Sequence, residues 1–302
     1  MTLDDAYLAH RDALWRAAYA ITGLASDADD IVQDVWLRLN RAQPDTDRPL
    51  GPWLRRVTCN LGRDRLRARK RLVYPGTWLP SPVCIGDGLP GVRCLASTAP
   101  LPPDARLDRA ESVHFALLVA LEQLPETGRL VLVLRDVLGC STRETAEHLD
   151  LSEANVRVVL HRTRNHLTDA VPSDPAPYDG ELVARFVDAV VRADIEALRR
   201  VLAADVEHIT DSGGRVTAAG VPLHGVERVT RVLMALQRRA EVQDLQLGTL
   251  GSMPTLSLRT GSAIRRWPPR TVVMLDIAGG SIRRLLTLAN PDKLSRGHAI
   301  DG

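Results

Sequence analysis

Arginine side chains gather in two stretches of this 302-residue sequence and give it its clearest capacity for chemistry. Between residues 55 and 71, eight Arg and Lys side chains are opposed by Asp64 alone, and a smaller cluster holds Arg157, Arg162 and Arg164. Guanidinium groups bind phosphate oxygens through paired hydrogen bonds, so arginine clusters on helices are typical of nucleic-acid-binding surfaces. The alternative is a merely solvated helix face, and the position of both clusters inside helical units argues against it.

An acidic segment precedes the larger cluster. Residues 27–38 read Asp-Ala-Asp-Asp-Ile-Val-Gln-Asp-Val-Trp-Leu-Arg, and their apolar side chains recur at helical spacing. We expect Gly23 to end the preceding helix and Ser26 to cap this one. Four side chains should face outward: Asp30, Gln33, Asp34 and Arg38. Such an acidic face is complementary in charge to a basic surface on a partner protein. A role confined to the helix dipole would explain Asp27 but not Asp34.

Proline and apolar spacing predict the elements that position these side chains. Residues 7–71 should be helical, with Pro52 in the first turn of the helix that carries the larger cluster. Many prolines and glycines make residues 73–104 a linker. Residues 105–170 should be helical again.

Within that second helical region, two helices joined by a short turn predict a helix-turn-helix. Ser141 and Glu144 have the spacing of a capping box at the start of the first helix. The second helix should bury a stripe of four side chains: Val156, Leu160, Thr163 and Leu167.

The chain changes character after a second proline-rich linker. Residues 178–295 alternate short β-type runs, such as 216–219, with turns, and helices are expected over 182–202 and 226–239. Helices packed on a curved antiparallel sheet make an α+β domain. The predicted fold class is therefore multidomain: two all-α regions followed by an α+β domain.

Several classes of protein are excluded by what the sequence lacks. No apolar run approaches a membrane span and the first residues lack a secretion signal, so we expect a cytoplasmic protein with no membrane partner. The four cysteines lack metal-site spacing, and no nucleotide-binding loop is present. We expect no metal, no cofactor and no enzymatic activity.

The residues 27–38 resemble region 2.2 of the extracytoplasmic-function sigma factors, residues 52–71 resemble regions 2.3 and 2.4, and residues 108–168 resemble region 4. The resemblance implies a region 2 helical bundle (1–72), a linker (73–104) and a region 4 helix-turn-helix (105–170). It implies two partners, core RNA polymerase at the acidic helix and promoter DNA, which is duplex at the −35 element and melted at the −10 element.

The resemblance assigns DNA contacts to both arginine clusters. For the −35 element the candidates are Glu153, Ala154, Arg157, His161, Arg162 and Arg164. For the −10 element they are Arg55, Arg56, Arg63 and Arg67. Arg157 is our candidate for reading bases. The loop 41–49 would hold a flipped base, while Trp36, Trp53 and Tyr19 are expected in the core.

Three further motifs resemble the sigma-J-like subgroup, whose C-terminal extension is SnoaL-like with an NTF2-like fold. They are Tyr74–Val83 (which contains Trp-Leu-Pro), Asp211–Val216 and Asn290–Leu294; Ser81, Ser212 and Arg215 depart from the subgroup's pattern. We expect these motifs to form a contact that regulates the separation of the DNA-binding domains. Its residues are Trp78, Leu79, Pro80, Asp211, Gly213, Gly214, Asn290, Pro291, Asp292 and Lys293.

Two other functions stay open at this point. One is a helix-turn-helix regulator that works without polymerase. The other is a ketosteroid-isomerase-like enzyme fused to a DNA-binding module, in which His208, Asp211, His224 and Trp267 would line a pocket. A small ligand of the C-terminal domain, of unknown identity, stays open as well.

Overall fold

The computed structural model describes residues 3–44, 49–72, 74–81, 114–170, 179–250, 253–261 and 266–294. The chain divides into two compact units. The helical unit comprises Met1–Val73 and Leu117–Ser173, and the C-terminal unit comprises Tyr74–Ala116 and Asp174–Gly302. In the parts described, no helix is long and apolar enough to cross a membrane.

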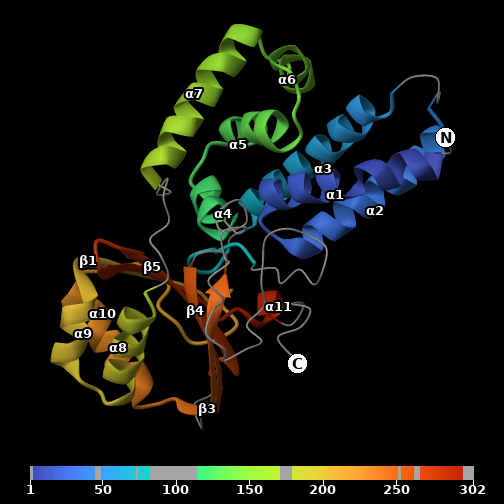
Figure 1. Cartoon of the computed structure of the whole chain (residues 1–302). Coiled ribbons are helices and arrows are strands. Elements are labelled where there is room, and N and C mark those ends of the chain that lie inside the picture. The colour runs from blue at the N-terminus through green and yellow to red at the C-terminus, as the bar shows by residue number, and fades with distance from the viewer. Residues whose placement is uncertain are drawn as a thin grey trace. The chain divides into compact units, whose positions relative to one another are not determined.

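The first half of the helical unit holds α1 (Leu3–Thr22), α2 (Ala25–Ala42) and α3 (Gly51–Arg71), drawn in blue in Figure 1. Gly23, with φ of 70°, follows the end of α1, and Pro52 lies in the first turn of α3, as predicted. The prediction for Ser26 is wrong. Helix α2 already begins at Ala25, and Leu24 precedes it without a side-chain cap.

The second half holds α4 (His114–Glu122), α5 (Glu126–Leu132), the π-helical turn η2 (Val133–Val137), α6 (Thr142–Leu149) and α7 (Glu153–Ala170). The Ser141 hydroxyl accepts from the Glu144 N–H and the Glu144 carboxylate accepts from the Ser141 N–H, which is the predicted capping box. Asp150, with φ of 56°, ends α6, so that α7 can follow as the second helix of a helix-turn-helix.

A common core joins the two halves of the helical unit. It consists of eight buried residues from both halves: Ala17, Ile21, Cys59, Leu66, Leu130, Val133, Leu134 and Cys140. The buried Arg129 adds polar links, because its Nη1 donates to the Ile21 carbonyl at 2.8 Å and pairs with Glu122 at 2.6 Å. A buried guanidinium is stable only when it is paired in this way.

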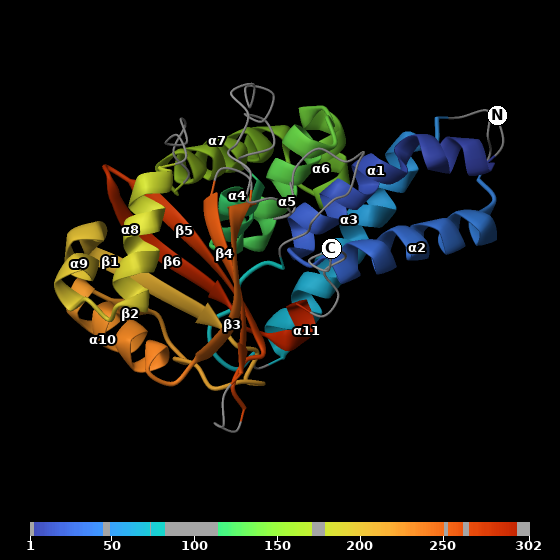
Figure 2. The same ribbon diagram turned by 60° about the horizontal axis from the view of Figure 1, so that its bottom comes forward.

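The C-terminal unit contains α8 (Gly180–Val191), α9 (Ile195–Val201), β1 (Leu202–Asp211), β2 (Leu223–His224), α10 (Val226–Gln237), β3 (Glu241–Leu250), β4 (Met253–Gly261), β5 (Arg270–Ala278), β6 (Ser281–Leu288) and α11 (Pro291–Leu294). The sheet has the order β2-β1-β6-β5-β4-β3. Helices α8, α9 and α10 gather against it and share one apolar core with it (Figure 2).

The α+β class is confirmed, with three differences in detail. The sheet is mixed, because β1 pairs with β6 in parallel. The helix expected over 182–202 is two helices, since Ala193, with φ of 56°, breaks it. Residues 216–219 form no strand, and the short β2 lies further along the chain.

Candidate functional site

Helix α7 presents the predicted −35 residues on its outer side. The inner side is buried as expected, through Val156, Leu160, Thr163 and Leu167. All six candidates are exposed: Glu153, Ala154, Arg157, His161, Arg162 and Arg164. The Arg157 guanidinium pairs with Glu153 at 2.7 Å within the helix, and Arg164 pairs with Asp136 of η2 at 2.6 Å. Exposed pairs of this kind contribute little stability, so phosphate can replace the carboxylates.

Helix α3 carries the predicted −10 residues, but two of them are engaged within the helical unit. Arg55 pairs with Glu144, the capping-box residue of α6, at 3.4 Å, and Arg67 pairs with Glu126 of α5 at 3.0 Å. Arg56 is exposed and Arg63 is half-buried. The arginine track is therefore partly covered by carboxylates of the other half of the same unit.

Helix α2 has an arginine beside its acidic face that was not among the predicted residues. Arg65 of α3 lies within 3.2 to 3.7 Å of carboxylate oxygens of Asp27, Asp30 and Asp34. Burial raises the pKa of Asp27 even though Arg65 opposes the shift. The sequence did contain a signal for this contact. Arg65 lies four residues after the buried Leu61, so it is on the side of α3 that packs inward.

The remaining candidates on α2 lie outside this cluster, since Gln33 and Arg38 are exposed. Of the aromatic side chains, Tyr19 is buried, as predicted. Trp36 and Trp53 are only half-buried, so their assignment to the core is wrong; Trp36 packs on Tyr7 with 5.2 Å between ring centres. Of the predicted flipped-base loop, 41–49, residues 45–48 lie outside the described residues, and the first two residues belong to α2.

The three motifs of the sigma-J-like pattern meet in the C-terminal unit around one buried carboxylate. Asp211 is fully buried. Its Oδ2 accepts from the Leu79 N–H at 2.8 Å and from Lys293 Nζ at 2.6 Å, and its Oδ1 accepts from the Tyr74 hydroxyl and from the Gly213 N–H. Both oxygens are thus fully paired. We call Tyr74, Trp78, Leu79, Asp211, Asn290 and Lys293 the linker clasp.

Lys293 holds the linker side of the clasp in three ways. Besides its ion pair, Nζ donates to the Leu79 carbonyl and lies 3.9 Å from the centre of the Trp78 ring, a cation–π contact. The Asn290 amide donates to the Tyr74 hydroxyl at 2.9 Å. Burial and the Asp211 carboxylate raise the pKa of Tyr74 far above its ordinary value, so its hydroxyl remains a hydrogen-bond donor.

Two glycines permit the close approach of these segments. Gly213 and Gly214 have φ of 56° and 66°, a region that favours glycine. A Cβ on Gly213 would overlap the Asn290 side chain, and one on Gly214 would lie 2.6 Å from Pro75. Tyr74 was missing from the predicted set although it opens the linker motif.

The other predicted residues lie around the clasp. Pro80 is buried, Pro291 begins α11, and the exposed Asp292 pairs with Arg215 at 2.9 Å. The four residues expected to share a pocket do not come together. His208 and Trp267 line a cavity, whereas Asp211 belongs to the clasp and His224 is exposed beside Glu207. Among described residues, no group of His, Cys, Asp and Glu could hold a metal ion.

Comparison with known proteins identifies the two helical regions and similar whole chains. Family models match residues 6–72 as Sigma-70 region 2 and residues 114–167 as Sigma-70, region 4. The chain is 34% identical over 297 residues to the ECF RNA polymerase sigma factor SigJ of Mycobacterium tuberculosis, covering 94% of this chain and 91% of the relative. It is 29% identical over 298 residues to the probable ECF RNA polymerase sigma factor SigI of that species, covering 96% and 93%. The crystal structure of the same SigJ superposes with a TM-score of 0.68 and 29% identity, covering 96% and 97%.

Proposed function

This chain belongs to the extracytoplasmic-function family of RNA polymerase sigma factors, and on that premise we propose that it binds core RNA polymerase and directs it to specific promoters in the cytoplasm. The observation that carries the proposal is α7, which buries one apolar face and exposes Arg157, Arg162 and Arg164 on the other. Such a helix fits the major groove as the second helix of a helix-turn-helix.

At the −35 element, α7 reads duplex DNA. Arg157 lies in the first turns of the helix, where base edges are within reach, and a bidentate Arg contact to guanine discriminates by about 1–3 kcal/mol. Glu153 and Ala154 lie beside it at the helix start. His161, Arg162 and Arg164 lie further along and contact phosphates, which fix the register of the helix on the duplex.

At the −10 element, the arginines of α3 hold a melted strand. Arg55, Arg56, Arg63 and Arg67 supply phosphate contacts that offset the cost of unstacking bases. Because Glu144 and Glu126 pair with Arg55 and Arg67 in the helical unit, DNA must displace these carboxylates first. Binding of the −10 strand therefore competes with the contact between the two halves of the unit.

Polymerase binds the outer face of α2, through Asp30, Gln33, Asp34 and Arg38. The acidic groups orient the association with a basic surface of the enzyme. Arg65 of α3 forms ion pairs with Asp30 and Asp34 and so restricts the positions of their carboxylates.

The C-terminal domain has a regulatory and not a catalytic role. The linker clasp ties the chain at Tyr74–Leu79, only a few residues beyond the end of α3, to the C-terminal domain. It thereby shortens the free chain between the −10 and −35 modules and limits their separation. The cavity offers no carboxylate among its described lining residues, which speaks against the ketosteroid-isomerase-like alternative, because that chemistry needs an Asp in the pocket.

Run-off transcription with core polymerase and a promoter library tests the proposal. The full chain should direct transcripts from a subset of templates, and Arg157→Ala should lower their yield about tenfold. Arg185→Ala is the matched control, because Arg185 also forms an exposed pair with the Glu four residues before it, on α8. Absence of any transcript dependent on this protein contradicts the proposal. Co-purification with core polymerase excludes the polymerase-independent regulator.

A further inference from the structure

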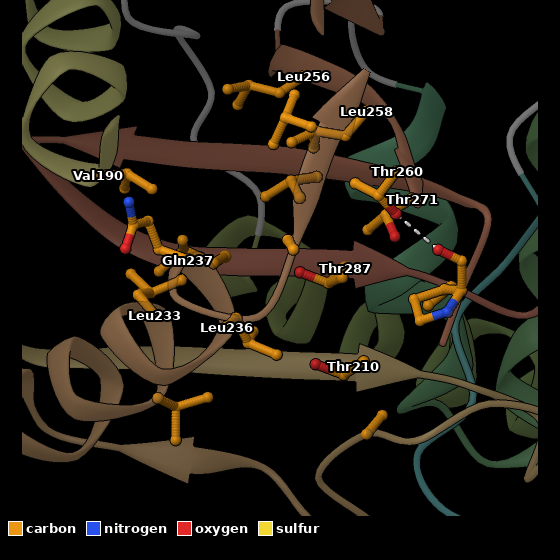
Figure 3. Close-up of a pocket in the computed structure, with 18 of the residues that line it drawn as sticks. Val190, Thr210, Leu233, Leu236, Gln237, Leu256, Leu258, Thr260, Thr271 and Thr287 are labelled. Carbon is orange, nitrogen blue, oxygen red and sulfur yellow. Dashed lines mark hydrogen bonds between the residues drawn. The ribbon is translucent and has the colours of Figure 1, made fainter. Parts of the chain in front are cut away.

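The C-terminal unit contains a cavity, open at one side, that the proposed function does not use. Its volume is about 460 Å³, within the range of small-molecule sites. Figure 3 shows side chains from α8, α10 and several strands pointing into it, among them Val190, Leu233, Leu256 and Leu258. It lies wholly within one compact unit.

The lining is apolar and carries no net charge. As far as the residues of this wall are described, none is Asp, Glu, Lys or Arg. The single titratable group among them is His208, and burial lowers its pKa to about 4, so the ring is neutral near neutral pH. An ionised ligand would lose its hydration without gaining a counter-charge, and the cavity therefore selects against ions.

Polar groups gather at one end of the cavity. Figure 3 shows Thr210, Thr260, Thr271 and Thr287 on one side and Gln237 on the other. His208 Nε2 lies 2.9 Å from the Thr287 hydroxyl and 3.2 Å from the Thr210 hydroxyl. Hydroxyl groups both donate and accept, so this end can bind a hydroxyl or a carbonyl. His208 Nδ1 is buried and has no hydrogen-bond partner in the structure described.

The mouth of the cavity is apolar as well. Three of its lining residues are among the exposed large hydrophobic side chains of the protein: Val191 at 64%, Val242 at 54% and Leu236 at 36%. Exposed apolar side chains that also line an apolar cavity are a feature of binding sites more than of ordinary solvent-facing surface.

We propose that this cavity binds an uncharged, mainly apolar small molecule that directs one hydroxyl or carbonyl group toward Thr210 and Thr287. The inference goes beyond the sigma-factor function and does not depend on it, since the site lies within the C-terminal unit alone. Leu236 at the mouth controls entry, and the threonine end fixes orientation.

Two probes that differ in charge test the proposal on the full chain. N-phenyl-1-naphthylamine is neutral, and 8-anilinonaphthalene-1-sulfonate adds a sulfonate to the same ring system. With direct excitation of the dye, the neutral probe should give saturable one-to-one fluorescence enhancement. The anionic probe should bind at least about tenfold more weakly. Equal binding of both probes, or no saturable binding of the neutral one, would overturn the proposal.

Variants locate the site. Leu236→Trp should plug the mouth and weaken binding of the neutral probe about tenfold or more. Leu247→Trp is the matched control: Leu247 is 40% exposed on β3, lies outside the lining, and should leave binding within about twofold. Thr287→Val keeps the volume and removes the hydroxyl, so it should weaken binding of 1-naphthol, a neutral probe that carries a hydroxyl group, several-fold more than binding of N-phenyl-1-naphthylamine, which has none. Equal effects of the two Trp variants, with native circular dichroism, would place the dye elsewhere and refute the assignment.

Discussion

The linker clasp and the cavity use the same two strands but have opposite chemistry. Strand β1 supplies Thr210 to the cavity and Asp211 to the clasp, and the residues after β6 supply Ala289 to the cavity and Asn290 to the clasp. The clasp is polar, sealed and fully paired around its carboxylate, whereas the cavity is apolar and open. A paired buried cluster fixes one geometry, while an unfilled apolar volume leaves room for a ligand.

The largest effect should come from breaking the ion pair of the clasp. Asp211→Asn leaves the Lys293 ammonium buried without a counter-charge, and we expect a loss of about 3–5 kcal/mol in the stability of the C-terminal unit. Asp292→Asn, which breaks the exposed pair with Arg215, should cost at most about 1 kcal/mol. Urea unfolding followed by amide exchange of β1 and β6 measures both. Similar losses for the two variants would mean that the clasp is no more than a surface contact.

The contribution of the cavity to stability should depend on pH, because His208 lines the cavity. The pKa of His208 is about 4 in the folded protein, below the ordinary value of about 6.5, so the unfolded chain takes up the proton first as pH falls. The contribution of the neutral His208 ring to the free energy of unfolding is fully present above about pH 6.5. It is lost as the pH falls toward about 4, and the total loss is roughly 3 kcal/mol. Unfolding of the C-terminal unit over this range should lose much of its pH dependence in His208→Gln. The exposed His224→Gln is the control; an unchanged profile in His208→Gln would contradict the assignment.

A smaller effect on stability separates two roles of Gly213, its close approach to Asn290 and its left-handed backbone conformation. Gly213→Ala should destabilise the unit by about 2 kcal/mol or more, because its φ is 56° and the added Cβ overlaps Asn290. Gly279→Ala, at φ of 61° with open space around it, should cost only about 1 kcal/mol. Thermal unfolding of the two variants gives the comparison. Equal losses of stability in the two variants would show that the Asn290 side chain can move aside at no cost in free energy.

Local signals were enough to predict much of this molecule. Proline placed the start of α3, the Ser141–Glu144 spacing gave the capping box, and the period of 3.6 residues gave the buried face of α7. These features depend on residues within one or two turns of each other. The motifs that form the clasp could be found because each carries unusual residues, although their partners are distant in the chain.

Features that depend on distant segments were missed. The pairing of Arg55 with Glu144 and of Arg65 with three aspartates is set by helix packing, which the local pattern does not contain. The parallel pairing of β1 with β6 joins strands separated by most of the domain. Ser26 is not the cap because α2 begins at Ala25, and Leu24, two residues before Ser26, occupies the cap position without a capping side chain.

The smallest expected effect tests whether the two regions communicate. The Ala289 N–H donates to the Asp211 carbonyl at 2.8 Å. This hydrogen bond links a residue that lines the cavity, after β6, to the clasp carboxylate residue at the end of β1. Filling the cavity with N-phenyl-1-naphthylamine should restrict Thr210 and Ala289 and thereby slow opening of the clasp. Since the Leu79 N–H donates to Asp211, its amide exchange reports that opening directly and should slow about two- to fivefold. The amide of Leu247, on β3, should not change. If Leu79 exchanges at the same rate with and without the dye, the clasp is a fixed tether and the cavity acts independently of it.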